Sequence, residues 1–184
     1  HSDDRSFNIG LITRIFGMDA NAPGYLSEEE AKNNPTKAAD FAKTDGGEQT
    51  NKHLSLHMDY NIRPDTYWTL KAYSQNLSRK RWATFSPQGQ QEERVLDDDQ
   101  YGVISTLSHR ITTPLFNSLK LEWGMNYQYQ DNSNRRFDSR DRVRIQPTRD
   151  WDIEQYNWGT YLQADGDMTR WLRLISGLRV DLLD

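Results

Sequence analysis

The segment LKLEWGMNYQYQ, residues Leu119–Gln130, alternates strictly between two kinds of side chain. Apolar or aromatic residues occupy every odd position, whereas lysine, glutamate, glycine and amides occupy the even positions. Successive side chains of a β-strand point to opposite faces, so this alternation predicts a long strand with one continuous apolar face. The fold then depends on whether that face packs on a protein core or on lipid.

The composition excludes several classes of protein. The chain has 184 residues, a net charge of -4 and no cysteine, and its mean hydropathy is -0.95. The acidic balance gives no reason to expect a nucleic-acid partner, and the lack of cysteine excludes disulfides and thiolate zinc sites. No stretch approaches the ~20 apolar residues of a transmembrane helix. A transmembrane β-strand needs only ~9–11 residues with every second one apolar, so a membrane barrel with long polar segments fits this hydropathy.

Period-2 alternation recurs along the whole chain. The alternating segments lie at about 7–15, 54–62, 68–82, 101–111, 119–130, 156–164 and 172–180. Long polar loops are predicted near 17–50, 83–100 and 131–152, and short turns at 63–66, 113–117 and 165–168. Long and short connections therefore alternate, as in outer-membrane barrels, which have short periplasmic turns and long extracellular loops.

Aromatic residues gather near both ends of the predicted strands. Tyr60, Trp68, Phe116 and Trp171 lie near the short turns; Trp82, Tyr101, Tyr127, Tyr129, Tyr156 and Trp158 lie near the long loops. Such rings favour the two membrane–water interfaces. We therefore predict an all-β fold, an antiparallel transmembrane β-barrel segment of about seven strands. The alternative is a soluble antiparallel sheet with one face on a core and the other in water.

The stretch Trp158–Asp181, WGTYLQADGDMTRWLRLISGLRVD, has an aromatic-Gly-x-Tyr-x-Gln opening, a short turn, a Trp-Leu start and a Gly-Leu-Arg-x-Asp end. This pattern resembles a hairpin of TonB-dependent outer-membrane receptors, a family that often has tyrosine at the position of Val180. Asp19–Phe41 looks like a long extracellular loop of siderophore-type members, with an Ala-Pro-Gly-Tyr-Leu segment and a short helix. Ser27 and Glu30 form the capping-box pattern expected at the start of that helix.

The resemblance implies a siderophore receptor in the outer membrane of a Gram-negative bacterium. Members of this family have an N-terminal plug domain, a TonB-contacting segment and a barrel of about 22 strands. Residues 1–184 show no plug, so we expect an internal fragment of the barrel domain. The resemblance further implies an iron(III)-siderophore chelate as the transported ligand, with energy from the TonB complex. It implies no cofactor, and the lipid bilayer and lipopolysaccharide as surroundings.

The segment Asp131–Asp152 holds the main candidates for ligand contact. Arginine forks recognise carboxylates and catecholates, and aromatic rings pack against a chelate. The predicted ligand-binding residues are Tyr25, Trp82, Arg135, Arg136, Arg140, Arg142 and Trp151. Alternatively, the interleaved aspartates of this segment neutralise its arginines, or the arginines meet anionic lipopolysaccharide.

No catalytic motif is present, so we do not expect an enzyme. The sequence has no phosphate-binding loop, no nucleophile elbow and no H-E-x-x-H zinc motif. His53, His57 and Asp59 share one strand face. Polar side chains in contact with water are a simpler interpretation of this group than a metal site. Two other functions stay open: a passive porin-like or lipid-transport barrel, and a soluble extracellular β-domain that binds carbohydrate or protein.

Overall fold

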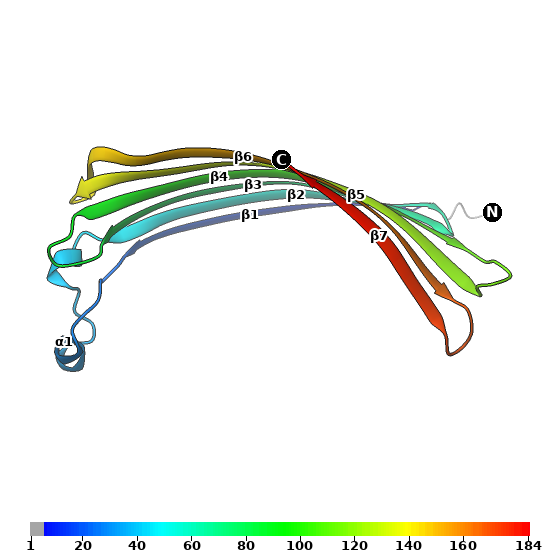
Figure 1. Ribbon diagram of the computed structural model, residues 1–184, viewed down its shortest axis with the longest axis horizontal. Coiled ribbons are helices and arrows are strands. Elements are labelled where there is room, and N and C mark those ends of the chain that lie inside the picture. Colours follow the sequence, from blue (N-terminus) through cyan, green and yellow to red (C-terminus); the bar gives the residue numbers. More distant parts are fainter. Residues whose placement is uncertain (1–5) are drawn as a thin grey trace.

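The computed structural model describes residues 6–184, which form one antiparallel sheet of seven strands in sequence order (Figure 1). The elements are β1 (Phe7–Asn21), α1 (Glu28–Asn33), the 3-10 helix η1 (Asp40–Ala42), β2 (Gly46–Arg63), β3 (Thr66–Thr84), β4 (Gln91–Ile111), β5 (Ser118–Arg140), β6 (Val143–Asp167) and β7 (Arg173–Leu183). Every strand pairs with its neighbours in sequence, which confirms the all-β antiparallel prediction. No helix among residues 6–184 is long and apolar enough to cross a membrane.

The strands are longer than predicted at the end that carries α1. The segments near 83–100 and 131–152 were expected as loops, but β4 begins at Gln91, and β5 and β6 continue to Arg140 and Val143. The irregular part of the 17–50 segment is likewise confined to residues 22–45. These extensions are mostly polar, and their few apolar residues do not alternate regularly, so their hydropathy resembles that of a loop. Their backbones nevertheless pair across strands.

A two-residue turn closes the longest hairpin, between β5 and β6. Asp141 and Arg142 have φ angles of 51° and 65°, the positive values that a tight type I′ hairpin turn requires. The register shifts twice near this turn, between Arg136 and Phe137 and between Asp138 and Ser139. The extra residues are on β6, where they bend the strand close to the tip.

One face of the sheet is apolar from edge to edge. Cross-strand pairing places side chains from all seven strands in single rows. One row is Phe7, Tyr60, Trp68, Leu107, Trp123, Leu162 and Leu178; a second is Leu11, Leu56, Ala72, Val103, Tyr127, Trp158 and Leu182. Most of these side chains are not covered by protein: Leu11 is 69% exposed and Leu178 is 72% exposed. The apolar face therefore has no protein core above it.

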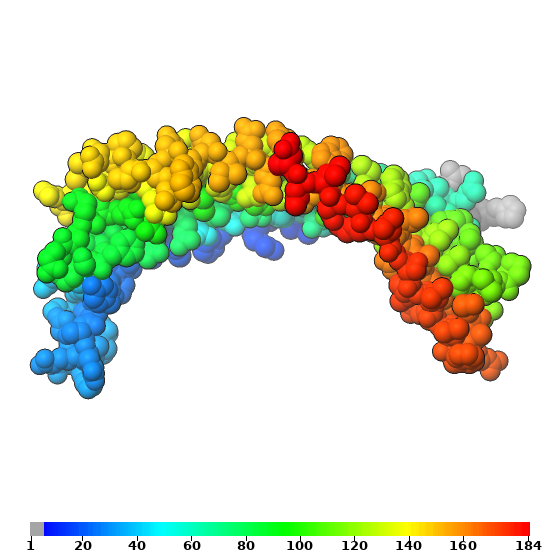
Figure 2. Space-filling view, in the orientation of Figure 1, coloured from blue at the N-terminus to red at the C-terminus, as the bar shows by residue number. Residues whose placement is uncertain are grey.

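The opposite face is polar, and its side chains contact one another. One of its rows is Arg14, His53, Gln75, Gln100, Gln130 and Gln155. Asp98 on this face is buried and accepts hydrogen bonds from the amides of Gln130 at 2.6 Å and Gln100 at 2.9 Å. The sheet is a single curved layer, hollow on one side, as Figure 2 shows. The side chains on its polar face satisfy one another rather than a second layer.

A small packed cluster lies at the α1 end of the sheet. The buried apolar residues of the described chain all belong to it: Ala39, Ala42, Trp82, Ala83 and Val95. Buried Asp45 accepts hydrogen bonds from the Thr84 backbone N–H at 2.6 Å and from the Gln91 amide at 2.8 Å. The cluster thus joins the β1–β2 loop to β3 and β4.

Candidate anion-binding site

Four arginines form one cross-strand row on the polar face, near the α1 end of the sheet. Arg81 of β3 pairs with Arg94 of β4, Arg94 pairs with Arg136 of β5, and Arg136 pairs with Arg149 of β6. We call these four residues the arginine row. Like charges that face one another directly across strands destabilise a sheet. This arrangement therefore needs anions nearby to offset the repulsion.

The adjacent cross-strand row, on the side away from α1, adds to the same site. It contains Arg79, Leu96, Asn134 and Trp151. The guanidinium of Arg149 lies 3.9 Å from the centre of the Trp151 ring, a cation–π contact. Trp151 remains 54% exposed beside that contact, so one aromatic surface is open next to the cations.

A single carboxylate, that of Glu92, contacts the arginine row. Glu92 accepts from Nε and Nη2 of Arg94 at 2.9 and 2.7 Å, and its other oxygen lies 3.6 Å from Nη1 of Arg136. Within residues 6–184, neither Arg79, Arg81 nor Arg149 has a carboxylate within 4.0 Å. On this part of the polar face, one carboxylate therefore serves five arginines, namely Arg79 and the four members of the arginine row.

A hollow of about 210 Å³ opens between these side chains. It is lined by Arg79, Arg81, Arg94, Val95, Leu96, Asn134 and Arg136. Nε of Arg136 is buried there and has no hydrogen-bond partner. A buried donor without a partner costs free energy, which a bound acceptor would recover. The residues of the hollow can therefore hold carboxylate, catecholate or phosphate oxygens through charged hydrogen bonds.

The structure brings together two of the residues predicted for ligand contact, Arg136 and Trp151, on the polar face. Arg135 points to the opposite face, because neighbours on a strand alternate. There it pairs with Asp150 at 3.1 Å and with Asp152 at 3.8 Å. For Arg135 the alternative interpretation, neutralisation by interleaved aspartates, fits the contacts better.

Two other predicted residues are part of the packed cluster. Arg142 donates from Nε to the Thr44 carbonyl and from Nη2 to Asn21, both at 2.9 Å. Its guanidinium also lies 4.8 Å from the centre of the Trp82 ring. Trp82 is only 6% exposed, so it offers little surface to a ligand.

Tyr25 and Arg140 are exposed at the α1 end of the sheet, and Tyr25 shares one neighbour, Phe85, with Arg94 of the arginine row. Tyr25 is 57% exposed, donates to the Phe85 carbonyl at 3.3 Å and packs against Phe41. Arg140 is at the end of β5 and lines a separate polar hollow of about 400 Å³ together with Phe41. The structure does not place these two side chains with Arg136 and Trp151.

Four arginines of this site, Arg79, Arg81, Arg94 and Arg149, were not among the ligand residues predicted from the sequence. Arg79 and Arg81 belong to the polar face of their alternating strand, and that alternation was a usable signal. Arg94 and Glu92 lie in a segment that was expected as a loop, where no face can be assigned. Their position became clear only from the pairing of β4 with β5.

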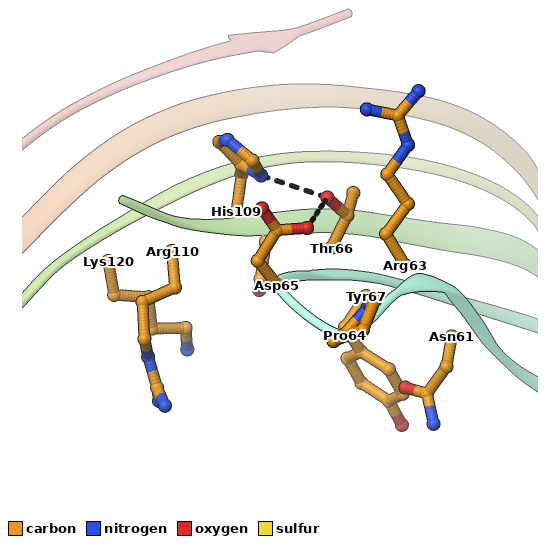
Figure 3. Close-up of a pocket in the computed structure, with 10 residues that line it drawn as sticks. Asn61, Arg63, Pro64, Asp65, Thr66, Tyr67, His109, Arg110 and Lys120 are labelled. Atoms are coloured by element: carbon orange, nitrogen blue, oxygen red, sulfur yellow. Dashed lines mark hydrogen bonds between the residues drawn. The ribbon is translucent and has the colours of Figure 1, made fainter. Parts of the chain in front are cut away.

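A second hollow, of about 230 Å³, lies at the tight β2–β3 turn and contains several cations (Figure 3). Arg110 and Lys120 extend to one side of the ribbon, whereas His109 and Arg63 extend to the other. The Thr66 hydroxyl lies 2.9 Å from both Asp65 and Nδ1 of His109. The cations do not converge on one point, so this hollow is a weaker candidate. Across residues 6–184, no group of three or more His, Cys, Asp or Glu side chains is placed to hold a metal ion.

Comparison with known proteins agrees with the fold. The family described as "TonB dependent receptor-like, beta-barrel" matches residues 2–183. Among solved structures, the unliganded ferric citrate transporter FecA superposes with a TM-score of 0.79 at 14% sequence identity. The match covers 96% of this chain and 27% of the transporter, so the chain spans about a quarter of that protein's length. No curated protein sequence matches. The chain belongs to the TonB-dependent receptor β-barrel family.

Proposed function

We propose that the receptor containing this barrel segment binds an anionic iron(III)-siderophore chelate through the arginine row and imports it. The observation that carries this proposal is the row itself: four arginines in register on adjacent strands, with one carboxylate to neutralise them. Adjacent strands are ~4.8 Å apart, so the row extends over ~14 Å, which suits a ligand with several anionic groups. Arginine provides paired donors for each such group.

Family membership supports the rest of the proposal. Receptors of this family reside in the outer membrane of Gram-negative bacteria and receive energy through TonB, and we propose the same for the intact protein. The structural neighbour FecA is named as a ferric citrate transporter, and citrate is a polycarboxylate. The apolar face would contact the lipid bilayer and lipopolysaccharide, and the polar face would line the interior of the barrel.

The predicted ligand residues divide accordingly. Arg136 and Trp151, together with Arg79, Arg81, Arg94 and Arg149, are proposed to contact the chelate. Tyr25 and Arg140, which are exposed at the same end, stay predictions for ligand contact in the intact protein. Arg135, Arg142 and Trp82 are used in contacts within the protein.

The test is the affinity of the purified intact receptor for iron(III) citrate, measured by calorimetry, in the variant Arg136→Gln. We expect binding to weaken at least about 30-fold, because truncating one partner of a desolvated charge pair costs roughly 2–5 kcal/mol and every 1.4 kcal/mol is tenfold in affinity. Binding should also weaken as salt rises, because the attraction is electrostatic.

Arg135→Gln is the matched control for this experiment. It removes the same charge from the neighbouring residue, whose side chain is on the opposite face. Its affinity should stay within about twofold of the unmodified receptor, because exposed ion pairs contribute little. Equal effects of the two variants would contradict a role for the arginine row. Uptake that continues without TonB would instead favour a passive barrel.

A further inference from the structure

Glu92 occupies the position that a ligand carboxylate would take in the arginine row. It lies two residues from Arg94 on β4, so both side chains are on the polar face. One of its oxygens receives two hydrogen bonds from Arg94, and the other approaches Arg136 at 3.6 Å. The carboxylate therefore bridges arginines of two adjacent strands, and its side chain is 21% exposed.

The bridge between Glu92 and Arg136 is incomplete. The separation of 3.6 Å is too long for a hydrogen bond, and Nε of Arg136 is buried without a partner. Glu92 thus satisfies Arg94 and leaves Arg136 partly unsatisfied. A ligand anion with shorter contacts to Arg136 would gain hydrogen bonds that Glu92 does not make.

We propose that Glu92 is a specificity-determining residue, a resident carboxylate that competes with ligand anions for Arg94 and Arg136. This inference rests on the proposed function of the arginine row as an anion site. Because Glu92 is tethered beside its partners, its effective concentration is high, in the millimolar range or above. A small monoanion that replaces Glu92 brings the same single negative charge, so it gains no electrostatic attraction over the tethered carboxylate. A polyanionic chelate displaces Glu92 because it also engages Arg79, Arg81 and Arg149.

A purely structural role predicts the opposite effects of mutation. If Glu92 only braced Arg94 and Arg136, its loss would free those side chains and weaken any ligand that depends on their position. If Glu92 competes with the ligand, its loss would strengthen the binding of anions and leave neutral ligands unchanged. The sign of the change therefore separates the two roles.

The experiment measures the binding of three probes to the intact receptor in detergent by calorimetry: iron(III) citrate, inorganic pyrophosphate and a neutral iron(III) trishydroxamate. In Glu92→Gln we expect both anionic probes to bind about tenfold more tightly at low salt, equivalent to about 1.4 kcal/mol. The affinity for the neutral chelate should not change. The gain should shrink at high salt as the attraction is screened.

Asp150→Asn is the matched control, because it also removes one arginine-paired carboxylate but from the opposite face. Its effect on the anionic probes should stay below about twofold. An equal gain in Asp150→Asn, or unchanged or weaker anion binding in Glu92→Gln, would overturn the role of Glu92. Glu92→Ala, with the same expected direction, replaces Glu92→Gln if the amide variant does not fold. If the unmodified receptor binds neither anionic probe, the proposed function itself fails, which is a different result.

Discussion

Two tyrosines on the polar face lie flat over glycines of the neighbouring strand. Gly124 faces Tyr161, and Gly102 faces Tyr73. A methyl group added at either glycine would collide with the tyrosine ring. Tyr161 also donates a hydrogen bond to Glu122 at 2.9 Å. The missing Cβ therefore provides space for a ring that covers the backbone, a known way of compensating glycine in a sheet.

Gly124→Ala tests this packing at the scale of one residue. The methyl group should push the Tyr161 ring aside and disrupt its bond to Glu122, at a cost of about 1–3 kcal/mol, as for other overpacked sites. The measurement is the urea midpoint of unfolding of the intact receptor in lipid vesicles. Gly17→Ala is the control, because nothing lies within 4 Å of the added methyl. A midpoint that does not differ between the two variants would contradict the account.

At the scale of elements, the β1–β2 loop is ordered by local capping and by distant anchors. Ser27 and Glu30 form the capping box of α1 that their spacing predicted. Glu30 also pairs with Lys37 at 3.0 Å. The far end of the loop is held by Asp45 and by Arg142, which reaches it from the β5–β6 turn. Three hairpins are thereby joined at the α1 end of the sheet.

The order of this loop should depend on acid pH. Hydrogen bonds from Lys37 and Ser27 lower the pKa of Glu30 from its usual 4.5 to about 2. Because the folded pKa is depressed, ionised Glu30 stabilises the loop fully above about pH 4.5, and this contribution is lost as the pH falls through about 2.

A nitroxide label at position 33, after Asn33→Cys, reports this change, since the sequence has no cysteine of its own. Its mobility should rise between pH 4.5 and pH 2. In Glu30→Gln the label should be mobile at every pH, because the neutral amide pairs weakly with Lys37. If the resonance line shape of the label does not vary with pH in the protein that keeps Glu30, the link between Glu30 ionisation and the order of the loop is disproved. A label at Thr50 on β2 is the control.

At the scale of the whole molecule, the sheet has one apolar face and one polar face, and these two faces determine how it would be oriented in a membrane. On the apolar face, Tyr101, Tyr129 and Tyr156 are side by side on β4, β5 and β6, with adjacent ring centres 6.4 and 4.9 Å apart. Beyond them, on the side of α1, the same face carries Asp99, Asp131 and Glu154. The tyrosines therefore mark where apolar surface gives way to charge, the position that aromatic belts take at a membrane surface.

Brominated lipids test that placement. The chain has six tryptophans, and single-tryptophan versions of the intact receptor are prepared by phenylalanine substitution. Lipids brominated on their acyl chains should quench Trp123 and Trp158, which are 49% and 50% exposed on the apolar face. They should not quench buried Trp82 or Trp151, which is on the polar face. Equal quenching at all four positions would contradict the proposed orientation.

The sequence by itself determined the strands, their alternating faces and the family. Alternation is a local property, because side-chain direction depends only on position along one strand. The same reasoning located the β2–β3 turn, the β4–β5 connection and the capping box. It placed the last turn at 165–168, whereas β6 continues to Asp167 and the connection to β7 is 168–172, and it missed the two-residue turn at Asp141 and Arg142. It failed where most residues are polar, as in residues 91–100 and 131–152, because the few apolar side chains there do not form a regular alternation that marks the period.

The arginine row was decided by tertiary structure alone. Its members come from four strands and lie up to 68 positions apart in sequence, from Arg81 to Arg149. What brings them together is the pairing register, and a slip of one residue would send a side chain to the opposite face. Arg135 and Arg136 show the consequence, since adjacent arginines meet aspartates on one face and arginines on the other. Composition could show that this segment is rich in arginine, but only the hydrogen-bonded register could show which arginines converge.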